Sequence, residues 1–250
     1  AARRRQRRRR RTAVVAVLAA AAVAIGVDIA RGPGTRVADR TLVGSAPPTA
    51  LTPTAAPPTA RYPARGPGTF GYAAGASPVQ GRAGLLRRYR VAVESGTGQD
   101  AAAFAADVDR ILGDPRGWSA GRRLRFQRVP GSGAADFTVL LATPVTSERL
   151  CAAGGLRTQR FTNCRVAGKV VINMARWWDA VPHYRAPLST YRAYVINHEV
   201  GHELGYGHVG CPRRGAYAPV MQQQTISLRG CRAYGWPYLR HRYHTGPAVP

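Results

Sequence analysis

The chain has 250 residues, of which 37 are Lys or Arg and 12 are Asp or Glu, so its formal net charge is +25 at pH 7. This length allows one domain with tails or two small domains. Lys169 is the only lysine, and such an arginine bias is typical of a GC-rich genome. We therefore expect no nucleic-acid partner, although a basic surface can hold the protein near polyanions such as a cell-wall polymer or acidic lipid.

The first 30 residues have the pattern of an export segment. Residues 3–11 are nearly all arginine, and residues 13–27 are apolar without interruption. Positive residues before an apolar stretch predict a cytoplasmic leader followed by a signal peptide or a signal anchor with its N-terminus inside. The apolar run would form a helix of about 22 Å, which is short against a hydrocarbon core of about 30 Å. Cleavage and membrane anchoring both stay open, and either predicts an extracytoplasmic protein.

Residues 31–68 are rich in Pro, Ala, Thr and Gly. Such a composition cannot bury enough apolar surface to fold, so we predict a disordered linker here. The folded domain is then expected over residues 69–245.

The domain begins with a strand pattern, in which Tyr89, Val91 and Val93 alternate with polar residues. Residues 97–100 resemble a capping box and predict the start of a helix, which Gly113 ends. The apolar positions on one face of this helix are Phe104, Val108, Ile111 and Leu112. Three more strands are expected, around Leu124 and Phe126, over residues 137–142, and around Val170, Ile172 and Met174.

The next helix should begin near Ser189, a good N-cap residue. It carries the start of an H-E-x-x-H-x-x-G-x-x-H motif over residues 198–208. Residues four apart lie about 6 Å apart on one helix face, so His198 and His202 can bind one metal ion. Glu199 lies one step round the helix, where its carboxylate can take a proton from a water activated by the metal.

The third ligand must come from beyond the helix, because a straight helix cannot aim His208 at the same point. Gly205 accepts a positive φ, so we expect it to end the helix and turn the chain back. No Asp or Glu follows Glu203, which excludes a downstream carboxylate ligand. Three neutral imidazoles leave the fourth position of a Zn²⁺ ion open, as in a catalytic site, so one catalytic Zn²⁺ is expected.

The other face of this helix should pack against the sheet through apolar residues. These residues are Ala193, Ile196, Val200 and Leu204. His198 lies about 200° round from Ile196, so we expect the ligands on the side away from that packing.

The motif, together with the downstream sequence Ala-Pro-Val-Met at residues 218–221, resembles the metzincin clan of zinc endopeptidases. In that clan a methionine turn forms a hydrophobic floor beneath the three histidines, and Met221 matches that methionine. The stretch from about Leu85 to Trp236 also resembles a secreted bacterial metzincin-like domain family of unassigned function, through residues 114–118, 141–144, 171–173 and 194–197. Gln223 occupies the position at which some metzincins carry a tyrosine ligand, so no fifth protein ligand is expected.

The resemblance implies an α+β fold in which a mixed sheet packs on the active-site helix, followed by a small irregular C-terminal subdomain. It also implies peptide-bond hydrolysis. We expect a monomer that cleaves a peptide or protein substrate lying extended along a sheet edge. Tyr206, Tyr217 and Tyr234 are candidates for stabilising the oxyanion only by their proximity in the sequence.

The four cysteines are Cys151, Cys164, Cys211 and Cys231. An even number in an exported chain predicts two disulfides. Of the three connectivities we favour the sequential pairs, 151 with 164 and 211 with 231. A structural zinc site is the weaker interpretation because no C-x-x-C pair is present.

The sequence therefore predicts a zinc-dependent endopeptidase with Glu199 as general base. One alternative is a catalytically inactive zinc-containing domain that binds peptide or cell-wall polymer, but zinc binding alone does not need Glu199. Another is a basic polyanion-binding protein, whose affinity would collapse with salt.

Overall fold

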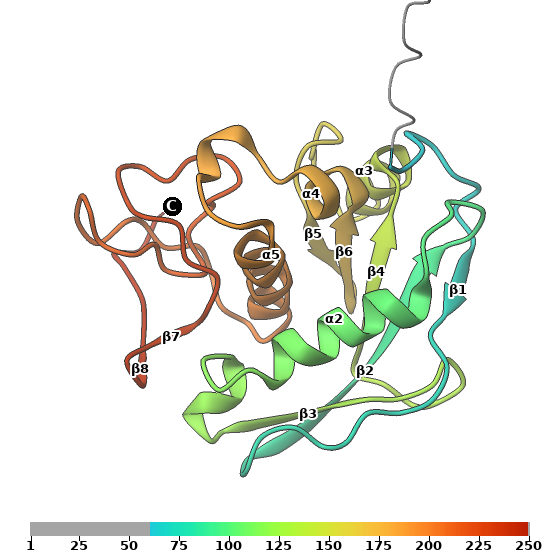
Figure 1. The fold of residues 1–250 in the computed structure, drawn as a ribbon, viewed down its shortest axis with the longest axis horizontal. Helices are drawn as coiled ribbons and strands as arrows, with labels where there is room; N and C mark the ends of the chain where they lie inside the picture. The colour runs from blue at the N-terminus through green and yellow to red at the C-terminus, as the bar shows by residue number, and fades with distance from the viewer. Residues whose placement is uncertain (1–60, 250) are drawn as a thin grey trace, which may run out of the picture. The chain divides into compact units, whose positions relative to one another are not determined.

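The computed structural model describes residues 61–249 (Figure 1). The predicted export segment and most of the predicted linker lie outside the described residues. The chain divides into two compact units, and the described residues belong to the second, Pro57–Pro250. In this described part, no helix is long and apolar enough to cross a membrane.

A mixed sheet of six strands forms the centre of the described fold. The strands are β1 (Phe70–Tyr72), β2 (Leu85–Glu94), β3 (Leu124–Arg128), β4 (Phe137–Ala142), β5 (Cys164–Val166) and β6 (Lys169–Asn173). Their order is β1-β2-β4-β6-β5, and β3 also pairs with β2. Strands β3, β4 and β6 continue the parallel sheet of β2, whereas β1 and β5 pair antiparallel to their neighbours. The short strand β5 therefore forms one edge of the sheet.

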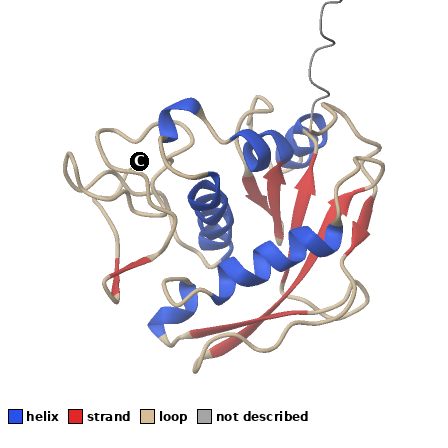
Figure 2. Cartoon of the chain, in the orientation of Figure 1, coloured by secondary structure: helices blue, strands red, loops and turns tan. Residues whose placement is uncertain are grey.

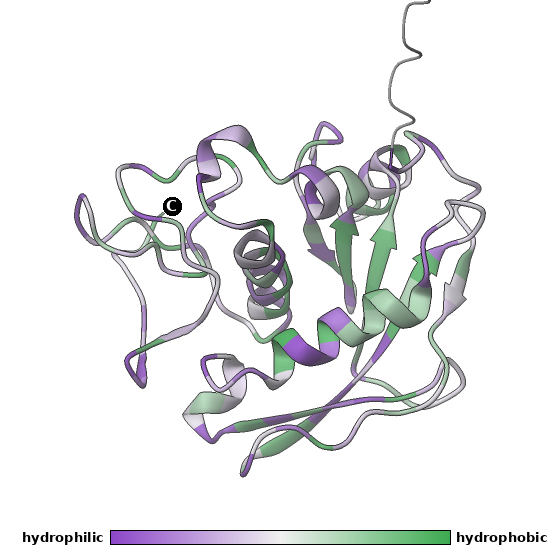
Figure 3. Cartoon of the chain, in the orientation of Figure 1, coloured by the Kyte–Doolittle hydropathy of each residue, from purple (hydrophilic) through white to green (hydrophobic). Residues whose placement is uncertain are grey.

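Strand β4 lies in the middle of the sheet, and all six of its residues are buried. Val139 and Leu141 belong to the larger hydrophobic core on one face, and Leu140 and Ala142 to a smaller core on the other. Side chains of a strand alternate between the two faces, so a strand covered on both sides must be apolar throughout. Figure 3 shows β4 and β6 as hydrophobic strands.

Helices cover both faces of the sheet (Figure 2). The larger core contains the apolar faces of α2 (Ala101–Gly113) and α5 (Leu188–Glu203), whereas α3 (Pro144–Ala152) contributes Cys151 to the smaller core. The remaining helices are α4 (Met174–Asp179) and the 3₁₀ turns η2 (Trp118–Gly121) and η3 (Pro182–Tyr184). The predicted α+β architecture with a mixed sheet is confirmed.

Both predicted N-caps need correction, although the second helix does begin near Ser189. The N-cap of α2 is Asp100, whose carboxylate accepts a hydrogen bond from the backbone N–H of Ala102 (2.8 Å). Thr97 lies outside the helix and donates its hydroxyl to the carbonyl of Glu94. Helix α5 starts at Leu188 after Pro187, so Ser189 lies within its first turn and is not the cap.

Helix α3 was not predicted, and the last parallel strand ends earlier than expected. Met174, expected in that strand, is the first residue of α4. The N-terminus of α3 is bound by Glu94, a distant residue at the end of β2, which accepts from Thr143 N (2.7 Å) and Thr146 Oγ1 (2.6 Å). Thr143 at the N-cap and Pro144 after it are typical of a helix start, but the Thr143 side chain makes no capping bond. The carboxylate that binds this end comes from 49 or more residues away, which no local pattern shows.

The packed part of the chain begins earlier than residue 69. Residues 61–68, expected in the linker, lie against the domain: Val145 N donates to Ala64 O (3.2 Å), and Gly68 N donates to Glu94 Oε1 (2.8 Å). The same buried carboxylate thus binds α3 and fixes the entry of the chain.

After α5 the chain has little regular structure, as predicted. The only strands described there are β7 (Tyr238–Leu239) and β8 (Arg242–Tyr243). Disulfides join Cys151 to Cys164 and Cys211 to Cys231, which confirms the predicted pairing. Two disulfides indicate a compartment outside the reducing cytoplasm.

Candidate functional site

Helix α5 carries the first two histidines of the motif on one face. The ring centroids of His198 and His202 are 4.7 Å apart, as expected for side chains four residues apart on a helix. The helix is more deeply enclosed than predicted, because both its apolar face and its ligand face are buried between Ala193 and Gly201. His198 is buried, whereas His202 and His208 are half-buried, so the histidines line a pocket that is partly open to solvent.

Gly205 ends the helix in the conformation that the sequence predicted. Its φ is 91°, and the N–H of the next residue, Tyr206, donates back to the carbonyl of Gly201 (2.9 Å). Gly205 N also donates to the carbonyl of His202 (3.1 Å). These two bonds form a Schellman motif, which requires a left-handed residue at the glycine. The turn brings His208 back over the helix.

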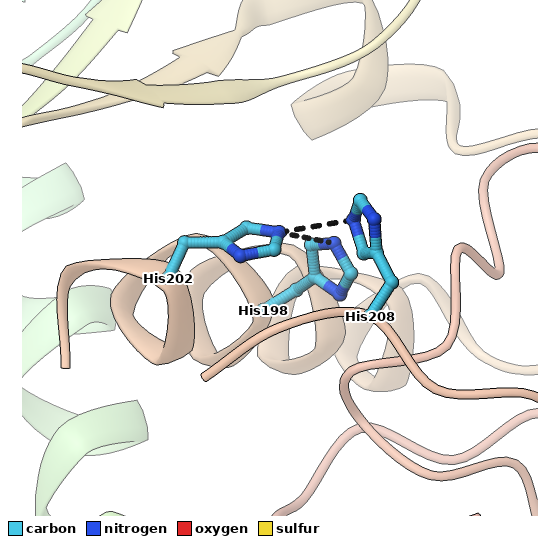
Figure 4. A group of neighbouring side chains, drawn as sticks. All are labelled: His198, His202 and His208. Atoms are coloured by element: carbon cyan, nitrogen blue, oxygen red, sulfur yellow. Dashed lines mark hydrogen bonds between the residues drawn. The ribbon is translucent and has the colours of Figure 1, made fainter. Parts of the chain in front are cut away.

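The three histidines converge on one point (Figure 4). The Nε2 atom of His202 lies 3.2 Å from Nε2 of His198 and 3.1 Å from Nε2 of His208. Their ligand atoms all lie within 4.8 Å of one another. Two of the three come from consecutive turns of α5, and the third comes from the loop beyond Gly205.

Hydrogen bonds fix the tautomers of two of these rings. Nδ1 of His198 lies 2.7 Å from the carbonyl of Val220, and Nδ1 of His202 lies 2.9 Å from the carbonyl of Tyr206. A carbonyl only accepts, so each Nδ1 carries the proton, and in the neutral ring Nε2 keeps a lone pair. Two lone pairs therefore face each other at 3.2 Å, an arrangement that a bound cation stabilises.

Burial keeps the rings neutral. It lowers the pKa of His198 from 6.5 to about 3, with a smaller contribution from His202. Burial also lowers the pKa of His202 and, together with the neighbouring His202 ring, that of His208. Near pH 7 all three are thus unprotonated, which is the form that binds metal.

Glu199 has a different environment from the surface carboxylates. Only 5% of its surface is exposed, and burial raises its pKa from 4.5 to about 8. It lines the same pocket as the histidines. A buried carboxylate with a raised pKa in a pocket is typical of a group that exchanges protons during a reaction.

Met221 lies directly beneath the helix. It is 1% exposed, and a Cβ atom at Gly201 would lie 2.3 Å from its sulfur and 2.8 Å from Cζ2 of Trp118. Met221 therefore packs against α5 where Gly201 leaves room, and it does not belong to the lining of the pocket that holds the histidines. Sequence reasoning treated Gly201 as a free position of the motif, because nothing local shows which side chains pack against it.

The pocket has a volume of about 470 Å³. One wall is the loop before β5 together with β5 itself, and the opposite wall follows Met221. Its lining is Leu156, Arg157, Thr158, Thr162, Asn163, Cys164, Arg165, Tyr194, His198, Glu199, His202, His208, Gln223, Thr225 and Ile226. The histidine motif thus lines a cleft between the edge of the sheet and the C-terminal segment.

None of the three tyrosines considered for the oxyanion lines this pocket. Tyr206 stacks on Trp118, with ring centroids 4.6 Å apart, and Tyr217 packs on Tyr234 at 5.2 Å. The tyrosine that does line the pocket is Tyr194. It precedes His198 by four residues, and this spacing was the signal that could have identified it.

Tyr194 is held in place from the opposite wall. Its hydroxyl accepts from the backbone N–H of Thr225 (3.3 Å), and its ring centroid lies 5.3 Å from that of His198. Gln223, which replaces the tyrosine of some metzincins, is exposed and also lines the pocket. Tyr194 therefore borders the site from a position that was not singled out from the sequence, whereas the position of Gln223 was considered there and no ligand was expected from it.

Residues 56–236 match the family DUF3152, whose description is "Protein of unknown function". The chain belongs to the DUF3152 family. No curated protein and no solved structure matches it. The DUF3152 match includes the whole histidine motif and Met221, and it ends before β7.

Proposed function

We propose that this member of the DUF3152 family is a zinc-dependent endopeptidase with a metzincin-like arrangement of its site. The observation that carries the proposal is the convergence of three imidazole Nε2 atoms, from His198, His202 and His208, beside a buried glutamate. Each of these four side chains lines one pocket. Structural metal sites are closed by four protein ligands, whereas three ligands in a pocket are typical of a catalytic one.

The donor set fits Zn²⁺. With Zn–N distances of about 2.0–2.1 Å, two ligands of a tetrahedral ion lie about 3.3 Å apart. The distances from His202 Nε2 to the other two Nε2 atoms, 3.2 and 3.1 Å, agree with this separation. The hydrogen bonds from Nδ1 to Val220 O and Tyr206 O supply the outer partners that orient metal-binding histidines.

A Zn²⁺ ion held by these histidines would lower the pKa of a bound water and polarise a carbonyl group. Glu199 would act as the general base, because the charge of a bound Zn²⁺ would offset the burial that raises its pKa and keep the carboxylate ionised. It would take a proton from the attacking water and give it to the leaving amine. Its position one residue after His198 places the carboxylate beside the three ligands. The carboxylate is only 5% exposed and lines the pocket, so it would face a substrate bound there.

Strand β5 is a suitable place for an extended substrate. It pairs only with β6 among the described strands, and Cys164 and Arg165 belong to the pocket lining. Its outer edge can pair with a peptide backbone by strand addition, which positions the peptide without selecting its sequence. We therefore propose a peptide or protein substrate that adds to this edge above the histidines.

The place of action follows from the disulfides and the predicted export segment. We propose that the domain works outside the cytoplasm as a monomer, either secreted or held at the membrane by residues 13–27. The basic composition would then keep it close to the anionic polymers or lipids of the cell surface.

The decisive experiment measures the zinc content and the proteolytic activity of the same preparations. Wild type should contain about one zinc per chain and cleave a mixed peptide library, and chelation should abolish cleavage. Glu199→Gln should keep the zinc and lose activity by about 10²–10⁴-fold, because it removes only the proton acceptor. His208→Ala should lose zinc, whereas His241→Ala, at an exposed histidine outside the triad, should keep both zinc and activity.

Two results would contradict the proposal. Equal cleavage by wild type and Glu199→Gln would exclude this glutamate as the base. A protein that binds zinc through the triad but cleaves no peptide would instead be a zinc-containing binding domain.

A further inference from the structure

The pocket wall formed by β5 and the loop before it carries two arginines, Arg157 and Arg165. Only Arg165 has an acidic partner. Arg165 binds Glu203, with Nε and Oε2 2.6 Å apart, and Nη2 of Arg87 lies 3.7 Å from the other carboxylate oxygen. The side chain of Glu203 is only 6% exposed. The charge of Arg165 is therefore neutralised by a carboxylate that is itself fixed at the end of α5.

Arg157 differs from Arg165 although it lines the same pocket. Within residues 61–249 its guanidinium makes no ion pair and no hydrogen bond. Glu148, the acidic residue that binds this loop, accepts from Thr158 Oγ1 and from the backbone N–H of Arg160. Arg157 thus presents an uncompensated positive charge to the cleft.

The remaining lining offers little that would repel an anion. Glu199 is the only carboxylate among the lining residues of the described pocket, and it lies at the base with the histidines. The other polar lining residues, apart from the two arginines and the histidines, are neutral. Exposed apolar side chains flank the cleft: Leu156 is next to Arg157 and is 42% exposed, and Ile226 on the opposite wall is 52% exposed.

We propose that Arg157 selects the substrate by binding a carboxylate of the peptide. The guanidinium presents a planar fork of N–H donors that matches a carboxylate in a bidentate geometry. The carboxylate belongs either to an Asp or Glu side chain near the scissile bond or to the C-terminus of the peptide. The apolar surface of Leu156 suits the aliphatic part of such a residue. This inference rests on the proposed peptidase function, because it assigns the substrate class of that site.

Binding tests the inference without requiring cleavage. Two fluorescein-labelled, C-terminally amidated peptide pools, identical except that one has Glu and the other has Gln at the varied positions, are titrated by anisotropy into Glu199→Gln protein. The Glu pool should bind about tenfold more tightly than the Gln pool. A free C-terminal carboxylate on the Gln pool should restore tight binding only if Arg157 recognises the chain end.

The control uses a second arginine of the same loop. Arg157→Ala should abolish the difference between the pools, and Arg157→Glu should favour a third pool that has Lys at those positions. Arg160→Ala removes the same charge three residues away but outside the pocket lining, so it should keep the preference for Glu. Circular dichroism of each variant checks that the fold is intact, which we expect because both arginines are exposed.

Equal losses in Arg157→Ala and Arg160→Ala would show only general electrostatic attraction and would overturn the inference. So would equal binding of the Glu and Gln pools. Cleavage assays with wild type separate the two proposals. If wild type cleaves peptides but Arg157 has no effect on binding, the peptidase proposal stands and the Arg157 proposal is wrong. If binding depends on Arg157 but no peptide is cleaved, the Arg157 proposal stands and the peptidase proposal is wrong.

Discussion

The described chain has two regions that are stabilised internally by different interactions. We call residues 61–203 the sheet region and residues 204–249 the C-terminal region. In the sheet region, backbone groups pair in strand ladders and helices around apolar side chains. In the C-terminal region backbone bonds are scattered between loops, and buried glutamine amides add to them: Gln222 Nε2 donates to Leu228 O and Gln224 Nε2 to Tyr234 O, each at 2.8 Å. Buried carbonyls need a partner in either case, but only the first kind of pairing follows from a repeating sequence pattern.

The candidate site needs both regions. His198 and His202 belong to the sheet region, whereas His208 and the carbonyl of Val220 that orients His198 belong to the C-terminal region. An ion bound by all three rings would therefore join the two regions. We expect the C-terminal region to be the less stable partner, because side-chain amides and one disulfide replace a sheet.

The largest expected effect concerns Glu199, which lies where the two regions meet. Its pKa is raised from 4.5 to about 8 by burial, and each pKa unit corresponds to about 1.4 kcal/mol. Between pH 4.5 and about 8 the unfolded chain has lost this proton while the folded chain keeps it. The contribution of Glu199 to the free energy of unfolding therefore falls as the pH rises through this window. Metal-free Glu199→Gln should gain stability over metal-free wild type from pH 5 to pH 8.

Urea unfolding of both metal-free proteins at several pH values measures this difference. The low pKa of His198 acts in the opposite direction below pH 6.5, because there the unfolded chain binds the extra proton. Comparing two proteins that differ only at position 199 removes that contribution. A stability difference that is constant from pH 5 to pH 8 would show that the carboxylate is not desolvated.

Removing each disulfide should have the next largest effect on stability. Each region contains one disulfide, so the two removals test the two regions one at a time. The disulfides span 13 and 20 residues, so each contributes about 3 kcal/mol by chain entropy. Replacing Cys211 and Cys231 by Ser should loosen the region that supplies His208 and weaken zinc binding. Replacing Cys151 and Cys164 by Ser should loosen the wall before β5, so that zinc is retained and peptide binding weakens.

Zinc competition with a chromophoric chelator and peptide anisotropy, measured on both double variants, check this division. Urea unfolding gives the accompanying loss of stability. If both variants lost zinc and peptide binding to the same extent, the two regions would form a single cooperative unit and the comparison would fail.

The sequence predicted those parts of the fold that repeat or that depend on near neighbours. Alternation identified β2 and β3, a buried run identified β4, and spacing brought His198 and His202 together before Gly205 turned the chain. It failed where a distant residue decides the structure. Glu94 binds the N-terminus of α3 from the end of β2. Of three consecutive glutamines, only Gln223 lines the pocket, while Gln222 and Gln224 are buried.

The smallest expected effect compares two glycines on either side of the boundary between the regions. A Cβ at Gly201 would meet Met221 and the rigid ring of Trp118, whereas a Cβ at Gly205 has no atom within 4 Å. Gly201→Ala should therefore cost about 1–3 kcal/mol by overpacking. Gly205→Ala should cost about 1–2 kcal/mol, because its φ of 91° strains any residue with a side chain.

Double variants with Met221→Ala distinguish these two causes. Truncating Met221 makes room for a Cβ at Gly201, so Gly201→Ala should cost less stability in that background. The stability cost of Gly205→Ala should stay the same. Urea unfolding of the four single and double variants against wild type and Met221→Ala measures both couplings. An equal cost of Gly201→Ala with and without the methionine side chain would mean that Met221 does not press on α5. The C-terminal region would then support the histidines through the hydrogen bonds of Val220 and Tyr206 and not through a packed floor.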